Sequence, residues 1–205
     1  FEHKIMNKPF SQACENNKRP ILDVLKSVCT EAGDLLEIGH GTGQHAVFLS
    51  QNLPHLNWTP ADVAENNWMI IEQQKNHSTL NNPLTLKINE KESMHSQLAN
   101  KSFDYVFSAN TLHIMSEKNA LRFCEEVAKV CNTKAKLLLY GPFKFNGEFT
   151  SDSNSRFDAH LRQQNPLMGI RDYEKLAQYL STNFEFIERY DLPANNQILC
   201  FHKND

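Results

Sequence analysis

The chain has 205 residues, of which 40% are apolar and 22% are charged, and its formal net charge is −3. This length and composition predict a single globular domain over residues 1–205 with a buried core. Lys and Arg form no cluster and no apolar run approaches ~20 residues, so neither nucleic acid nor a membrane is an expected partner.

The five cysteines are scattered along the chain, and no C-x-x-C pair occurs among them. An odd, dispersed set of cysteines is typical of a reduced protein and offers no pattern for a metal. We therefore expect a cytoplasmic protein without a metal site. The oligomeric state cannot be predicted from these features.

The first part of the chain predicts a helix followed by a strand. Residues 1–16 are polar and are expected to be irregular. Apolar residues then recur at helical spacing from Ile21 to Val28, with Pro20 in the first turn and Gly33 as the stop. An apolar run at residues 35–38 predicts the first strand.

The later segments alternate between strand and helix patterns. In chain order they are helix 46–50, strand 56–63, helix 65–77, strand 84–88, strand 102–108, helix 117–131, strand 136–140, a polar loop at 144–171, helix 172–181, and strands 184–190 and 197–202. This order predicts an α/β fold with a parallel sheet, helices on both faces and a terminal antiparallel strand pair.

The stretch at residues 34–45 reads D-L-L-E-I-G-H-G-T-G-Q-H, a strand that runs into a glycine-rich turn and a helix. Such a turn lets a ligand approach bare main chain at the start of a helix. The dinucleotide fingerprint needs a third glycine at the position of Gln44. The pattern here is E-x-G-x-G-x-G, which resembles motif I of the class I S-adenosylmethionine-dependent methyltransferases.

That resemblance implies that the turn holds the aminoacyl end of S-adenosylmethionine, through Gly39, Gly41, Gly43 and Gln44. It also implies that Glu37 organises the turn near the ammonium group of this cofactor. The alternative is a glycine-rich turn without a ligand.

Asp62 lies 25 residues after Glu37, at the end of the second predicted strand. In nucleotide-binding α/β folds an acid at this place accepts hydrogen bonds from the ribose hydroxyls. A helix cap is the alternative role for Asp62.

Several further patterns together resemble one small family of methyltransferase-like proteins whose substrate is unassigned. They are S-x-A-x-x-x-N-K-x-P-I at 11–21, N-x-L-H-I at 110–114, Y-G-P-F at 140–143, S-N-x-x-F-D-x-x-L-R at 153–162, G-I-R-D at 169–172 and P-A-N-N at 193–196. The resemblance implies a Rossmann-like methyltransferase fold with a seven-stranded, mostly parallel sheet. It also implies further contacts to the cofactor from Asn17, Lys18, Ile88, Asn89 and Asn110.

The sequence departs from this family at two places. Asn16 stands where Arg is expected, and Lys87-Ile88-Asn89 stands where an acid usually reads the adenine amino group. A lysine cannot accept that hydrogen bond, whereas the Asn89 side chain or a backbone carbonyl can. The departures leave open a weakened or lost activity.

Methyl transfer is an in-line displacement in which the protein aligns a nucleophile and removes its proton where required. His113 is the candidate base because its ordinary pKa suits proton transfer near neutrality; a helix cap or a cover over the cofactor is the alternative. Tyr140 either lines the pocket or belongs to the core. Arg162 and Arg171, within a predicted lid over residues 144–171, either grip a carboxylate or phosphate of the substrate, or pair with Asp158 and Asp172 and hold the shape of the loop.

Three functions follow from the sequence. The first is an S-adenosylmethionine-dependent methyltransferase acting on an unidentified small molecule. The second is a methyltransferase-like binding or scaffold protein without turnover. The third is an NAD(P)-dependent oxidoreductase, which Gln44 and the terminal strand pair disfavour.

Overall fold

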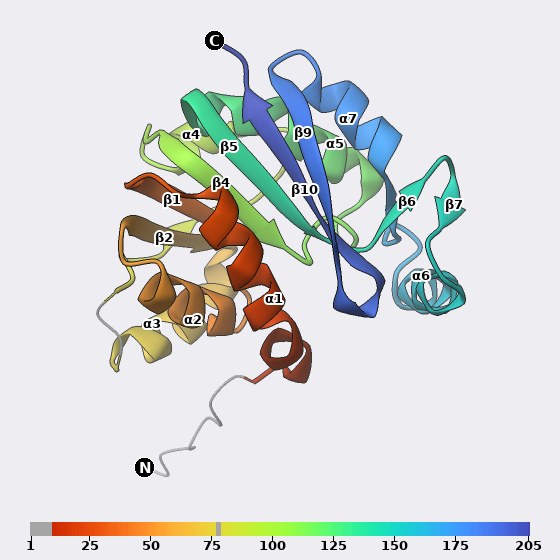
Figure 1. The fold of residues 1–205 in the computed structure, drawn as a ribbon, viewed down its shortest axis with the longest axis horizontal. Helices are drawn as coiled ribbons and strands as arrows, with labels where there is room; N and C mark the ends of the chain where they lie inside the picture. Colours follow the sequence, from red (N-terminus) through yellow and green to blue (C-terminus); the bar gives the residue numbers. More distant parts are fainter. Residues whose placement is uncertain (1–9, 77–78) are drawn as a thin grey trace.

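A computed structural model describes residues 10–76 and 79–205 of the chain, and its centre is a seven-stranded sheet. The strands are β1 (Gly33–Ile38), β2 (Leu56–Asp62), β3 (Leu84–Thr85), β4 (Phe103–Ala109), β5 (Cys131–Gly141), β9 (Phe184–Leu192) and β10 (Asn196–Lys203). Their order in the sheet is β3-β2-β1-β4-β5-β10-β9 (Figure 1). Only β10 pairs antiparallel, with β5 and with β9, which confirms the predicted sheet and its terminal pair.

Helices cover both faces of this sheet (Figure 1). One face carries α1 (Gln12–Val28), α2 (Gln44–Asn52) and α3 (Asn67–Gln74), and the other carries α4 (Met94–Gln97), α5 (Glu117–Glu126) and α7 (Tyr173–Leu180). Short 3-10 turns are η1 (Ala64–Asn66), η2 (Val127–Val130) and η3 (Pro193–Asn195).

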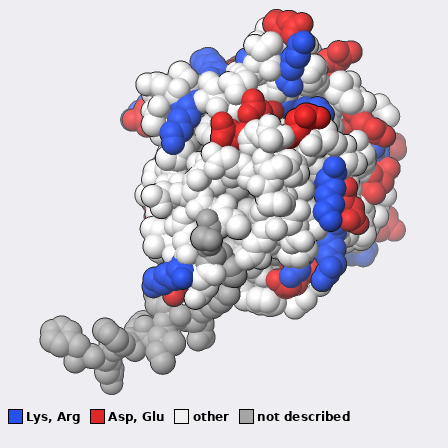
Figure 2. Space-filling model, turned by 60° about the vertical axis from the view of Figure 1, so that its left-hand side comes forward, with Lys and Arg blue, Asp and Glu red and all other residues white. Residues whose placement is uncertain are grey.

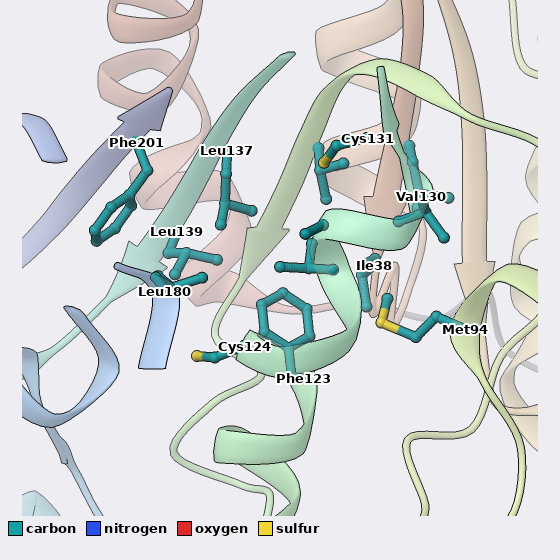
Figure 3. Packing of buried hydrophobic residues seen from close by; sticks show 14 of the residues in the cluster. Ile38, Met94, Phe123, Cys124, Val130, Cys131, Leu137, Leu139, Leu180 and Phe201 are labelled. Atoms are coloured by element: carbon teal, nitrogen blue, oxygen red, sulfur yellow. The ribbon is translucent and has the colours of Figure 1, made fainter. Parts of the chain in front are cut away.

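The central strands supply side chains to two separate cores, because successive residues of a strand point to opposite faces. On β5, Leu137 and Leu139 pack toward α5 and α7, while Leu138 packs toward α1 and α2. Figure 3 shows the core on the α5 side, where Phe123 is buried beside strand residues such as Leu139. The sheet is therefore buried on both faces, as its apolar strands predict.

The polar loop expected at residues 144–171 is instead an ordered insertion, so that prediction is wrong. It contains β6 (Phe143–Phe145), β7 (Glu148–Phe149), α6 (Asp152–Gln164) and β8 (Arg171–Asp172), and the three strands form a small sheet. Ser151 caps α6 by accepting a hydrogen bond from the Asn154 N–H (3.1 Å). The helix was missed because its few apolar residues give little periodicity, although Ser151 is a typical helix cap.

Three predictions near the start of the chain need correction. Helix α1 begins at Gln12, so residues 12–16 are not irregular and Pro20 lies inside the helix. The Ser11 hydroxyl caps this helix by accepting a hydrogen bond from the Cys14 N–H (3.3 Å). Gly33 does not stop the helix but opens β1, where a Cβ would meet the Asp104 carboxylate at 2.7 Å.

Several other elements begin or end at residues different from those predicted. Strand β3 has only two residues, and β5 begins at Cys131, which was placed in the preceding helix. Helix α3 ends at Gln74, and His77, expected as the end of that helix, lies outside the described residues. Tertiary pairing sets such ends, and local sequence patterns define them poorly.

Charged side chains lie mainly around the margin of the face that Figure 2 shows, where basic and acidic groups alternate. The centre of this face carries almost no Lys, Arg, Asp or Glu (Figure 2). A nucleic-acid backbone needs a continuous row of cations, and this face offers none.

Gly43 and Gly147 form a matched pair for testing how tightly the turn before α2 is packed. Both have a left-handed φ, of 79° and 75°, but a Cβ on Gly43 would meet Ile70 Cδ1 at 2.6 Å, whereas nothing lies within 4 Å of one on Gly147. Gly147→Ala should lower the free energy of unfolding by about 1 kcal/mol, and Gly43→Ala by about 1–2 kcal/mol more. Urea denaturation measures both, and equal losses would show that Ile70 does not restrict this turn.

Candidate functional site

A cavity of about 890 Å³ opens at the carboxyl ends of the parallel strands. Ligand sites of α/β folds lie at this edge of the sheet, and this volume suits a cofactor together with a small molecule. The start of α1, the turn after β1, the ends of β2 and β4, helix α6 and the turn between β9 and β10 all contribute to its walls.

The turn after β1 forms the floor of the cavity and is built from glycines. Gly39 and Gly41 line the cavity with φ of 78° and 53°, a conformation that strains other residues. A Cβ on Gly41 would have nothing within 4 Å, so a ligand has open space against this main chain. Gly43 does not line the cavity; it adopts the left-handed conformation directly before α2.

Asp62, at the end of β2, is fixed against the glycine turn. Its Oδ2 accepts the Gly41 N–H (2.9 Å), and its Oδ1 accepts the Val63 N–H (2.7 Å) and the Asn66 side chain (3.1 Å). Asp62 also lines the cavity, and a carboxylate has about four lone-pair positions. These bonds fix the carboxylate but do not cap a helix, because neither η1 nor α3 has a side-chain cap. The remaining lone pairs can accept ribose hydroxyls.

Glu37 lies behind the glycine turn and not on the cavity wall. It is buried on β1, and its Oε2 accepts the indole N–H of Trp58 (2.9 Å). Loss of hydration on burial raises the pKa of Glu37 to about 7, although the Trp58 hydrogen bond and His40 favour the charged form. Glu37 thus bonds to Trp58 of β2 and does not line the cavity, and its organising role near the cofactor's ammonium group stays a prediction.

Gln44 joins the glycine turn to the start of α1. Its Oε1 accepts the Ser11 N–H, and its Nε2 donates to the Ser11 carbonyl (3.3 Å) and to Glu15 Oε1 (3.0 Å). Gln44 therefore holds the first turn of α1 over the cavity. This gives a structural reason for the glutamine that departs from the dinucleotide fingerprint.

Asn17 and Lys18 have different positions on α1. Asn17 lines the cavity, and its Oδ1 lies 2.6 Å from His45 Nε2. Lys18 does not line the cavity; it pairs with Glu15 and lies over the Phe48 ring, 4.9 Å from the centroid. Burial lowers the pKa of His45 to about 4, so a neutral imidazole holds Asn17 in place at neutral pH.

The end expected to hold adenine is formed mostly by apolar side chains and contains no acid. Leu86 and Ile88 line it, together with the exposed Lys87. Asn89 does not line the cavity, because its Oδ1 accepts the N–H groups of Lys91 (2.8 Å) and Glu92 (3.0 Å). The structure thus brings Ile88 to the cavity and leaves Asn89 in a local turn.

The segment after β4 brings Asn110 and His113 to the cavity wall. Asn110 has a left-handed φ of 56°, and the His113 ring packs edge-on against Phe157 of α6 at 5.5 Å between centroids. Burial, and the nearby positive charge of Arg171, lower the pKa of His113 to about 4. The expectation of an ordinary pKa near neutrality is therefore wrong: His113 is a neutral imidazole at neutral pH, a weaker base than a free histidine, and it can accept a hydrogen bond or take up a proton from a strongly acidic group.

Tyr140, Asp158 and Arg162 do not line the cavity. Asp158 accepts hydrogen bonds from Arg162 Nε and the Ile170 N–H, both at 2.8 Å, so this pair holds the segment after α6 in shape. Tyr140 is buried, and among the described residues its hydroxyl has no well-aligned partner. Burial raises the pKa of Tyr140, and the amides of Asn17 and Asn196 are close enough to oppose that shift.

The sequence analysis missed several residues of the cavity wall. They come from segments far apart in the chain and include Cys14, His40, Asn66, Ile114, Asn119 and Phe157. Motifs had already marked two of them, since Phe157 lies in the S-N-x-x-F-D pattern and Ile114 ends the N-x-L-H-I pattern. Spacing alone could not find the others, because only the tertiary fold brings them together.

The described residues contain neither a metal-binding cluster nor a helix that could span a membrane. No group of three or more His, Cys, Asp or Glu side chains is placed to hold a metal ion in residues 10–76 and 79–205. None of the helices in this part of the chain is both long enough and apolar enough to cross a membrane.

Residues 8–203 match the model of the family described as Protein of unknown function (DUF938). Solved structures share the fold at low sequence identity. An O-methyltransferase family protein from Burkholderia thailandensis has a TM-score of 0.79 and 12% identity, over 94% of this chain and 58% of that one.

Human N-acetylserotonin methyltransferase, solved with S-adenosylmethionine, has a TM-score of 0.74 and 14% identity, over 95% of this chain and 53% of that one. An O-methyltransferase family 2 protein from Planctomyces limnophilus, solved with apigenin, has a TM-score of 0.70 and 11% identity, over 92% of this chain and 62% of that one. The chain thus spans little more than half the length of these proteins, and the likeness shows a methyltransferase-like fold.

The lowered pKa of His113 predicts a measurable loss of stability in acid. The unfolded chain takes up a proton on this residue near pH 6.5, whereas the folded chain does so only near pH 4. His113 should therefore contribute a loss of up to about 3 kcal/mol of unfolding free energy across this window, and His113→Gln should lack that contribution while the contribution of His45 remains.

Urea denaturation across this pH range measures the difference between wild type and variant. The control is His160→Gln, which removes an exposed histidine of α6. A difference that stays constant from pH 6.5 to pH 4 would contradict the account of a buried neutral imidazole.

Proposed function

The chain belongs to the protein family of unknown function DUF938, and we propose that it is an S-adenosylmethionine-dependent methyltransferase that acts on a small molecule. One observation carries this proposal: a single cavity joins the bare glycine turn, the carboxylate of Asp62 and the neutral imidazole of His113. The methyltransferase-like fold supports it.

The residues present fit the cofactor along most of its length. The open main chain at Gly41 suits the aminoacyl group, Asp62 suits the ribose, and Leu86 and Ile88 suit the apolar faces of adenine. When bound, S-adenosylmethionine supplies a methyl group already activated on a sulfonium. The chain has to bind it, exclude water and align an acceptor in line with the methyl group.

We assign to His113 the role of proton acceptor for a substrate oxygen. Its ring is neutral at neutral pH and is held in place by Phe157 and by the bond that its carbonyl accepts from the Gly169 N–H (2.9 Å). A fixed imidazole on the wall can take the proton that the oxygen loses as it gains the methyl group. The structural neighbours from Burkholderia thailandensis and Planctomyces limnophilus are named O-methyltransferases, which supports oxygen as the acceptor atom.

Ligand-dependent melting of the purified chain distinguishes this proposal from the two alternatives. A ligand at ~100 times its dissociation constant adds ~2.7 kcal/mol to the folded state, which raises the melting temperature by several degrees. S-adenosylmethionine and S-adenosylhomocysteine should produce this shift, whereas NAD and NADP should not.

A shift with NAD or NADP alone would favour the oxidoreductase and contradict the proposal. A shift with the sulfur cofactors, but no methyl transfer in a broad substrate screen, would favour a binding protein without turnover. No shift with any of the four ligands would contradict cofactor binding altogether.

Asp62→Asn tests the ribose contact directly. The amide loses one acceptor and the negative charge, so the affinity for S-adenosylhomocysteine should fall about tenfold or more, as for a lost charge-assisted hydrogen bond. Titration calorimetry measures the affinity, and Asp191→Asn, at an exposed position on β9, is the matched control. An affinity equal to that of the control would remove Asp62 from the site.

A further inference from the structure

The charged side chains of the cavity wall lie in one part of it. Apart from its histidines, Asp62 and Lys87 are the only residues that carry a formal charge among those that line it. Both lie where β2 and β3 end, on the side assigned above to ribose and adenine. The described residues therefore place every Asp, Glu, Lys or Arg of the cavity wall at the cofactor end.

The remainder of the wall, which includes His113, carries no Asp, Glu, Lys or Arg among the described residues. It combines amides and apolar groups from the β4–α5 connection, α5, α6 and the β9–β10 turn, among them Ile114, Asn119, Asn154, Phe157 and Asn196. Phe157 is 37% exposed and presents part of its ring to this space. This part of the wall can hold a flat apolar group and exchange hydrogen bonds with neutral polar groups.

The two arginines of the segment around α6, Arg162 and Arg171, supply no cation to this part of the wall. Arg162 is bonded to Asp158, and Arg171 donates from Nη2 to the Leu167 carbonyl (3.1 Å), and neither arginine lines the cavity. A substrate carboxylate here would lose its hydration without gaining a cation. A substrate ammonium would likewise meet no carboxylate. An unpaired charge that loses part of its hydration is unfavourable, so charged substrates are disfavoured here.

We propose that this part of the cavity selects an electrically neutral substrate, an aromatic alcohol that places its hydroxyl beside His113 and its ring beside Phe157. The proposal rests on the methyltransferase function proposed above. It replaces the possibility that Arg162 and Arg171 grip an acidic substrate, because both are committed to the shape of the segment around α6.

The acidity of a phenolic hydroxyl also favours an aromatic alcohol as the substrate. Burial and Arg171 both disfavour a proton on His113, so this imidazole is a weak base. A phenolic hydroxyl, with a pKa of about 10 as in tyrosine, gives up its proton more readily than an alkyl alcohol. The oxygen passes its proton to His113 as it bonds to the methyl carbon, and the carbon–sulfur bond breaks with its electron pair left on sulfur.

The test uses three probes of one shape that differ in charge: catechol, 3,4-dihydroxybenzoate and dopamine. Each is titrated into the full chain saturated with S-adenosylhomocysteine, and binding is measured by calorimetry. Catechol should bind at least about tenfold more tightly than either charged probe. If a charged probe binds equally well or better, or if catechol does not bind, the proposal is overturned.

A cation placed in the wall should reverse part of this preference. Ile114 lines the cavity and is 50% exposed, so Ile114→Lys adds a charge with little disturbance of the core. The affinity for 3,4-dihydroxybenzoate should rise about tenfold, as expected for a partly buried ion pair. Ile187→Lys, at an equally exposed position of β9 outside the cavity, should leave it unchanged.

Binding of S-adenosylhomocysteine distinguishes a failure of the proposed function from a failure of the neutral-substrate proposal. If neither wild type nor variant binds it, the proposed function fails. If both bind it and Ile114→Lys leaves the carboxylate affinity unchanged, only the neutral-substrate proposal fails. Asn119→Lys, on the first turn of α5, gives a second placement of the cation should Ile114→Lys not fold.

Discussion

The hydrogen bond from the Gly41 N–H to Asp62 is the contact on which the site depends. It joins the turn after β1 to the end of β2, so that the bare main chain and the carboxylate face the same cavity. Gly41 has a left-handed φ, which a glycine adopts without strain and which carries the chain on toward α2. Parallel pairing of β1 with β2 sets the distance that this bond spans.

A second set of contacts closes the cavity from the side of α1. Gln44 binds both main-chain groups of Ser11, and His45 holds Asn17, so two consecutive residues of α2 position the first turns of α1. In the dinucleotide fingerprint the position of Gln44 is a glycine, which has no side chain to make these bonds. Gln44, which argues against NAD binding, therefore also helps to hold this site together.

The sequence predicted the fold well and the site in part, for identifiable reasons. Strand and glycine patterns are local, so the order of elements, the turn at Gly41 and the acid at Asp62 were found before the structure. Contacts made by distant segments were not, as shown by Phe157 against His113 and by the ion pair that occupies Arg162. Helix α6 was missed because it buries few apolar side chains, and its polar sequence resembles a loop.

A crystal structure of the full chain with S-adenosylhomocysteine would test the central claim most directly. The account predicts the amino-acid part of the ligand against Gly39 and Gly41, its ribose hydroxyls bonded to Asp62, and its sulfur facing the side of the cavity that holds His113. A ligand bound elsewhere, or in this cavity with its ribose away from Asp62 and its sulfur away from His113, would contradict it.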